Sequence, residues 1–149
     1  MICVDASVVA KWLFTEDLSD RAEALYEETV RDGERIVAPA LLPIEITNLI
    51  RQRMRRLKAP HEELLTFTEA RQHLEQFLTF PVELSILPSI HRRALELAAI
   101  HTLPAVYDAH YLALADLLSI PFWTADHTLV NSLQQALPFV RWIGDYQQR

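Results

Sequence analysis

Residues 1–12 have the sequence MICVDASVVAKW, and this stretch decides the fold. The short apolar run Ile2–Val4 predicts a buried strand, and the apolar residues that follow at 6–14 predict a helix directly after it. Asp5 stands between the two elements. An unpaired charge at the end of a core strand is costly to bury, so this carboxylate needs a structural or chemical role.

The same alternation of short apolar strands and helices continues along the chain. Further strands are expected at residues 35–39, 81–88, 121–126 and 139–144. Further helices are expected at residues 19–33, 41–58, 60–78, 89–101, 107–119 and 127–137. Continuous apolar strands that alternate with helices are typical of a mainly parallel sheet with helices on both faces. The sequence therefore predicts an α/β fold, as a single domain over residues 1–149.

Composition narrows the classes of function. Half of the residues are hydrophobic and 23% are charged, as is usual for a soluble globular protein. No apolar run approaches the roughly 18 residues of a membrane span, and no secretion leader is recognisable. Cys3 is the only cysteine, which excludes an intramolecular disulfide. We therefore expect a cytoplasmic protein without a membrane association. Because only two glycines occur, glycine-rich phosphate loops are excluded.

Four acidic residues occupy related places in the predicted fold. Asp5 and Asp126 each follow a strand, Glu45 lies in the first turns of the helix after the second strand, and Asp108 lies in the first turn of an apolar helix. Ligands of parallel α/β sheets bind beyond the carboxyl ends of the strands, so these side chains are expected to converge. Clustered carboxylates need protons or a cation, and an oxygen-only site suits Mg²⁺ or Mn²⁺.

Each acid also has an ordinary structural explanation. Asp5 is a candidate helix cap, and Asp108 is placed to stabilise a helix N-terminus. Asp126 is a candidate turn residue, and Glu45 fits an exposed helix face. The histidines form no HExxH pattern, and the two beside the acids are interpreted as structural or surface residues: His110 and His127.

A basic stretch, RQRMRRLK, covers residues 51–58. The net charge of -6 argues against a general attraction of the whole surface to nucleic acid. The stretch is either a solvated helix face that pairs with acidic helices, or a contact for phosphate or a protein partner. Three of its cations follow Glu45 on the predicted helix and are candidates for contact with RNA or a partner: Arg51, Arg55 and Lys58.

Four blocks carry a resemblance to a known family. They are VDASVVAKW at residues 4–12, APALLPIEITNLI at 38–50, YDAHYLALA at 107–115 and FWTADHTL at 122–129. Their content, order and separation resemble the PIN-domain family, and most closely the VapC-like toxin ribonucleases of type II toxin–antitoxin systems. The resemblance covers nearly the whole chain, except that residues 60–88 carry no matching motif.

The resemblance implies a three-layer α/β/α PIN-like domain with one or two divalent ions. The acids that would form the catalytic and metal site are Asp5, Glu45, Asp108 and Asp126. Ser7 and Thr124 match the small hydroxyl residues that support such a site, and Asn48 is the supporting polar residue of the Glu45 block. The resemblance also implies an RNA substrate, a VapB-like antitoxin as partner, and a homodimer.

The expected function is a Mg²⁺-dependent endoribonuclease that hydrolyses phosphodiester bonds with metal-activated water. The alternative is a PIN-like module that binds RNA or protein without cleavage. A phosphatase that forms an aspartyl-phosphate is disfavoured, because such enzymes usually carry a second Asp two residues after the first, where this chain has Ser7.

Overall fold

The computed structural model describes residues 1–55, 64–133 and 135–148. Within these residues, five strands form one sheet with the order β3-β2-β1-β4-β5, and every pairing is parallel. The strands are β1 (Ile2–Val4), β2 (Ile36–Pro39), β3 (Val82–Ser85), β4 (Phe122–Thr124) and β5 (Val140–Trp142). The predicted α/β class with a parallel central sheet is confirmed.

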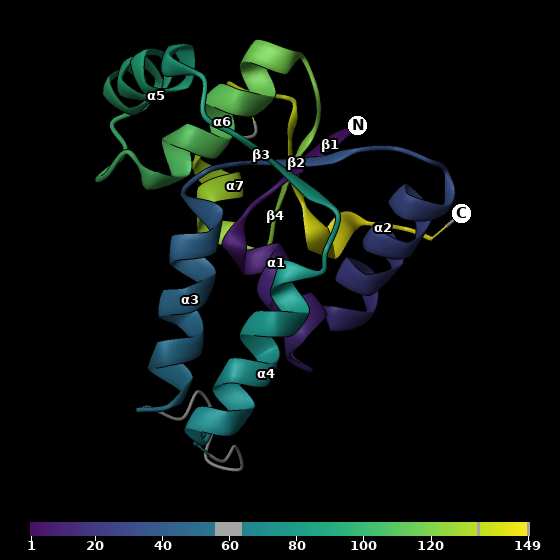
Figure 1. The fold of residues 1–149 in the computed structure, drawn as a ribbon. Coiled ribbons are helices and arrows are strands. Elements are labelled where there is room, and N and C mark those ends of the chain that lie inside the picture. Colours follow the sequence, from purple (N-terminus) through teal and green to yellow (C-terminus); the bar gives the residue numbers. More distant parts are fainter. Residues whose placement is uncertain (56–63, 134, 149) are drawn as a thin grey trace.

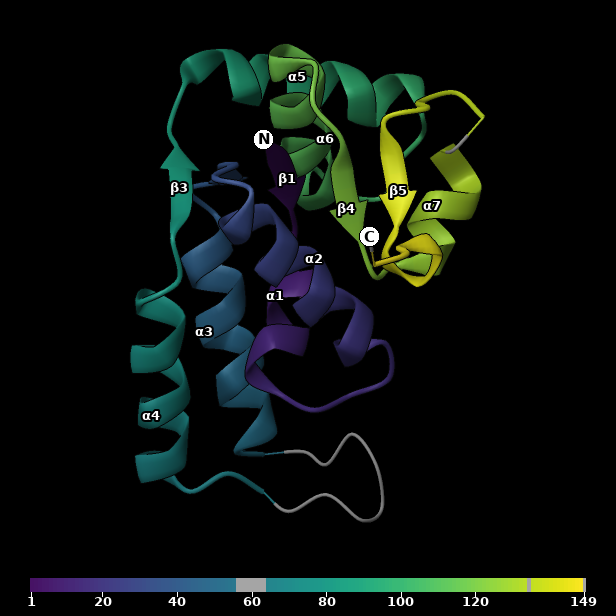
Figure 2. The ribbon, with the colours of Figure 1, turned by 90° about the vertical axis from the view of Figure 1, so that its right-hand side faces the viewer.

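Helices cover both faces of this sheet. They are α1 (Ala6–Leu13), α2 (Ser19–Arg31), α3 (Leu42–Arg53), α4 (Phe67–Leu78), α5 (Pro88–Ile100), α6 (Tyr107–Leu118) and α7 (His127–Leu133), with a 3₁₀ turn, η1, at Ile143–Asp145. Figure 1 and Figure 2 show α5 and α6 together on one side of the strands and α1 to α4 on the other. The three-layer α/β/α architecture is thereby confirmed. No helix in the described ranges has the length and apolar character needed to cross a membrane.

The core lies around β1 and α6. Cys3 and Val4 are completely buried, as the apolar run at the start of the chain predicts. Helix α6 packs against β1, β2 and β4 and is buried from Tyr111 to Ala115. A helix that is apolar on nearly all sides is usually buried in the interior of the protein. The packing of α6 on the central strands therefore holds its first turn in place.

The basic stretch differs from the prediction. Helix α3 ends at Arg53 instead of residue 58, because the Arg53 carbonyl accepts a hydrogen bond from the Leu65 N–H (3.1 Å) and its side chain pairs with Glu16. Arg55 therefore lies in the turn after the helix and is not on it. Lys58 lies outside the described residues.

The next helix also begins later than predicted. Helix α4 starts at Phe67, not at residue 60, and residues 64–66 are not helical. Thr66 and Glu69 form a reciprocal capping box, in which Glu69 Oε2 accepts from the Thr66 N–H (2.8 Å) and Thr66 Oγ1 accepts from the Glu69 N–H (3.3 Å). This pair satisfies amide groups of the first turn, so it sets the start of the helix.

The strand order positions the site. The chain passes from β1 to β2 on one side, whereas β4 lies against the other side of β1. The direction of the connections therefore reverses between β1 and β4. In open parallel sheets, ligands bind beyond the carboxyl ends of the strands at such a reversal. The turns that follow β1 and β4 are thus where functional side chains are expected.

Candidate active site

Asp5 lies in the turn between β1 and α1. Its Oδ1 accepts hydrogen bonds from the backbone N–H groups of Ser7 (3.0 Å) and Val8 (3.1 Å) and from Ser7 Oγ (2.6 Å). The interpretation of Asp5 as a helix cap is therefore correct. Because these three bonds all use Oδ1, capping does not require Oδ2, and the same side chain is able to cap the helix and bind a ligand.

Asp5 is only 6% exposed to solvent. This burial, together with the nearby charge of Asp108, raises its pKa to about 6. Hydrogen bonds from Ser7, Thr124 and Val8 favour the ionised form and offset part of that rise. Asp5 is therefore an anion held in a place where a cation would stabilise it strongly.

Asp126 occupies the equivalent turn after β4. Its Oδ1 accepts from the backbone N–H groups of Thr128 (2.8 Å) and Leu129 (3.0 Å), which begin α7. The interpretation of Asp126 as a turn residue is also correct, in the specific form of an N-terminal cap. Unlike Asp5, Asp126 is exposed to solvent.

Two hydroxyl groups join these turns. Ser7 Oγ accepts from the Ala125 N–H (2.8 Å) and lies 3.4 Å from Thr124 Oγ1. Thr124 Oγ1 in turn accepts from the Asp126 N–H (3.0 Å) and is fully buried. Ser7 and Thr124 thus connect the loop that carries Asp5 to the loop that carries Asp126.

Glu45 lies one turn into α3 and is half-buried. Burial and the charge of Asp108 raise its pKa, whereas a hydrogen bond from the Tyr111 hydroxyl to Oε2 lowers it. Tyr111 is 1% exposed, and burial beside Glu45 raises the pKa of its phenol, which keeps it a proton donor. Sequence reasoning missed Tyr111. The available signal was its spacing three residues after Asp108, on the same side of α6.

Asp108 stands in the first turn of α6 and is exposed. Partial removal of the carboxylate from water and the nearby charge of Asp126 raise the pKa of Asp108. The charge of Asp108 in turn raises the pKa of Asp5 and of Glu45. The four acids are therefore neighbours at one edge of the sheet. They do not close around one point, since no three Asp, Glu, His or Cys side chains of the described ranges are grouped to hold a metal ion.

The remaining polar candidates lie farther along α3. Asn48 and Arg51 are exposed and line a shallow depression on the outer face of the helix with Thr47. Arg55 is exposed in the following turn. Arg53, by contrast, is structural, because it pairs with Glu16 and its guanidinium carbon lies 4.1 Å from the centre of the Phe14 ring.

The histidines beside the acids make structural contacts. His110 Nδ1 lies 2.6 Å from the Val106 carbonyl oxygen, and Nε2 lies 2.9 Å from His91 Nδ1. His127 packs against Trp142, with the ring centres 4.5 Å apart. These contacts agree with the structural interpretation of both side chains.

The fold and the site together define a class of protein. Its members are α/β/α domains with clustered acidic residues at the point where the strand connections of a parallel sheet reverse direction. The PIN domain model matches residues 2–131, and the chain belongs to the PIN domain family. Ribonuclease VapC12 of Mycobacterium tuberculosis, strain CDC 1551, is 34% identical over 133 residues, which cover 89% of this chain and 92% of the relative. The protein of the same name from strain H37Rv matches equally.

Proposed function

We propose that the protein is a divalent-metal-dependent endoribonuclease, a VapC-like toxin. The observation that carries the proposal is the set of four neighbouring acids at the point where the sheet connections reverse, in a PIN domain. The similarity to a relative named as a ribonuclease over most of both chains supports RNA as the substrate. Single-domain organisation over residues 1–149 is part of the same proposal.

The donor set fits Mg²⁺ or Mn²⁺, because it consists of carboxylate oxygens and includes no sulfur. Asp5 and Asp108 would hold the ion, the first through Oδ2 from a rigid buried position and the second from an exposed one. A bound divalent ion would supply positive charge beside the scissile phosphate and lower the pKa of water in the site.

The other acids have different roles in this proposal. Glu45, held by Tyr111, would orient the attacking water and accept its proton, since its raised pKa lies closer to neutral than that of a free glutamate. Asp126, which caps α7, would be the fourth carboxylate of the acidic site. Ser7 and Thr124 would hold the loop of Asp5 and the loop of Asp126 in fixed positions relative to each other. Asn48 would support the Glu45 side of the site from the same helix.

Partners follow from the same proposal. Arg51, Arg55 and Lys58 would guide the RNA backbone toward an acidic centre that otherwise repels it, or contact a VapB-like antitoxin. Exposed apolar side chains on α5 and α6 support a homodimer, because large apolar groups at a surface favour association: Leu95, Ile100, Leu117 and Leu118. A cytoplasmic location is proposed with the RNA substrate.

The decisive experiment measures RNA cleavage by the purified protein with Mg²⁺ or Mn²⁺, with EDTA, and after Asp5→Asn or Asp108→Asn. We expect EDTA and either substitution to abolish cleavage. The control is Asp20→Asn, an exposed acid in the first turn of α2. Calorimetric titration with Mg²⁺ provides a second readout, in which Asp5→Asn should remove binding. Variants that cut RNA as well as the parent would show that the assigned site is wrong, and RNA binding without cleavage would favour the non-catalytic module.

The role of the basic residues is tested separately. Reversing Arg51, Arg55 and Lys58 to glutamate should weaken RNA binding and reduce its dependence on salt, because phosphate contacts release counterions. The matched control reverses Arg31, an exposed arginine on α2. If the triple variant retains both RNA cleavage and antitoxin binding, this role is excluded.

A further inference from the structure

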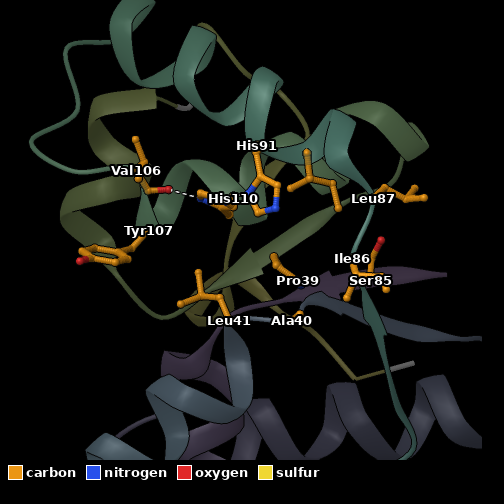
Figure 3. A pocket seen from close by; sticks show the side chains of 11 residues that line it. Pro39, Ala40, Leu41, Ser85, Ile86, Leu87, His91, Val106, Tyr107 and His110 are labelled. Atoms are coloured by element: carbon orange, nitrogen blue, oxygen red, sulfur yellow. Dashed lines mark hydrogen bonds between the residues drawn. The ribbon is translucent and has the colours of Figure 1, made fainter.

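A pocket of about 250 Å³ opens at the carboxyl ends of β2 and β3. It lies between the segment that enters α3, the segment that joins β3 to α5, and the first turns of α5 and α6, as Figure 3 shows. Its walls are mostly apolar and aromatic: Leu41, Ile86, Ile90, His91, Tyr107 and His110. None of the roles proposed for the acidic residues uses this pocket.

The pocket lies beside the acidic site along the same edge of the sheet. In the order β3-β2-β1-β4, the pocket lies over the first two strands and the acids Asp5 and Asp126 follow the other two. Tyr107 directly precedes Asp108. The Leu41 carbonyl accepts from the Glu45 N–H (3.2 Å), so the wall of the pocket and the acid belong to the same helical turn.

The polar groups of the pocket are held in fixed positions. The rings of His91 and His110 meet nearly edge to face, with centres 5.1 Å apart, and Nδ1 of the first lies 2.9 Å from Nε2 of the second. Figure 3 shows the His91 ring pointing from α5 into the pocket, with His110 beside it and joined to the Val106 carbonyl. Among the described residues, no aspartate, glutamate, lysine or arginine lines the pocket, so the pocket does not suit a phosphate or a charged side chain.

Its rim presents large apolar surfaces to solvent. Tyr107 is 61% exposed and Ile86 is 78% exposed, and both residues line the pocket. A flat aromatic ligand with a polar edge matches such a site, because its faces contact apolar groups while its edge reaches imidazole or hydroxyl groups. Proteins bind unpaired RNA bases in this way, by stacking on aromatic side chains and hydrogen bonding at the base edge.

We propose that this pocket binds one unpaired nucleobase of the RNA, on the nucleotide next to the phosphate that is cleaved. The inference rests on the proposed function, because the acidic site determines where the phosphate lies. The base would stack against Tyr107 and be read at its edge by His91, whose ring is oriented by the contact of its Nδ1 with His110 Nε2. The pocket would then contribute to the choice of the cleavage position.

The test compares an RNA cut at one defined phosphate with two versions that carry an abasic ribose on one or the other side of that phosphate. For the parent protein, kcat/KM should be about tenfold lower on one of the two abasic RNAs than on the complete RNA, as expected for the loss of one stacked base. Tyr107→Ala and His91→Ala should lose a similar factor on the complete RNA and nothing further on that abasic RNA. Phe67→Ala, which removes an exposed aromatic ring from α4, is the control and should behave as the parent.

Two measurements separate failure of this inference from failure of the proposed function. Equal cleavage of complete and abasic RNA by the parent, or pocket variants that cleave like the parent, would overturn the base pocket and leave the nuclease intact. Should the protein cut no RNA, binding of the same RNAs decides. A weaker affinity for one abasic RNA that disappears in Tyr107→Ala supports the pocket, and equal affinities reject it. Both substituted side chains are exposed, and thermal melting verifies that the variants are folded.

Discussion

The turns after β1 and β4 have the same local design and different surroundings. In each, an aspartate follows a short buried strand and its Oδ1 accepts two backbone N–H groups of the next helix. Asp5 is almost completely buried, whereas Asp126 is exposed. The comparison shows that the capping geometry sets where each carboxylate points, but burial decides how strongly that carboxylate requires a cation.

The largest expected difference between the two turns is in catalysis. Asp5→Asn should reduce kcat for RNA by about 10³-fold or more, because the variant loses the rigid buried anion that, in the proposed function, would hold the metal ion. Asp126→Asn should cost roughly 10- to 100-fold, the effect of a residue that assists a metal site. Asparagine keeps the cap in both variants. Single-turnover cleavage with saturating enzyme measures the two effects, and equal losses would remove the distinction between the turns.

The second difference concerns stability against pH. The pKa of Asp5 is about 6 in the folded protein and near 3.9 in the unfolded chain, so the folded state binds more protons between these values. The free energy of unfolding of the metal-free protein should therefore fall as the pH rises from about 4 to about 6. Asp5→Asn should remove this loss and raise stability at pH 7 by about 1–3 kcal/mol.

Urea unfolding in EDTA, at several pH values across that window, measures this effect. Asp126→Asn is the matched control and should keep the drop that comes from the buried Asp5 carboxylate, losing only the smaller part that the charge of Asp126 adds by raising the pKa of Asp108. A parent protein whose stability does not change between pH 4 and pH 6 would contradict the burial assigned to Asp5.

The smallest expected effect comes from the group that connects the turns. Ser7→Ala removes a donor to Asp5 and an acceptor for the Ala125 N–H, and should cost about 1–2 kcal/mol of stability. Ser132→Ala is the control, because its hydroxyl only donates to the Leu129 carbonyl within α7 and should matter little. Thermal unfolding compares the two. If Ser132→Ala is the more destabilising, the two turns are not held together through Ser7.

The sequence predicted the strands and the places of the acids because both depend on local pattern. Asp5 and Asp126 each follow a continuous apolar run, and such runs identify parallel strands without knowledge of the partner strand. The catalytic role of the acids stays a prediction. Tyr111 was missed because its contact with Glu45 joins residues that are 66 positions apart, and no local pattern encodes that distance.

The helix boundaries show the same limit. Helix α3 ends at Arg53 through contacts with Leu65 and Glu16, which are distant in sequence, whereas no glycine or proline marks that end. The start of α4 was predictable from the spacing of Thr66 and Glu69, but Pro60 is the more conspicuous signal. The prediction that Arg55 lies on the helix was wrong for this reason, whereas Arg51 is on it and Lys58 lies outside the described residues.

The buried first strand also gives the protein an internal chemical reporter. Cys3 is the single thiol of the sequence and is completely enclosed, two residues before Asp5. Burial raises the pKa of that thiol, which further slows its reaction with disulfide reagents. The rate at which such a reagent labels the native protein therefore measures how often the central strand opens, and the measurement needs no introduced cysteine.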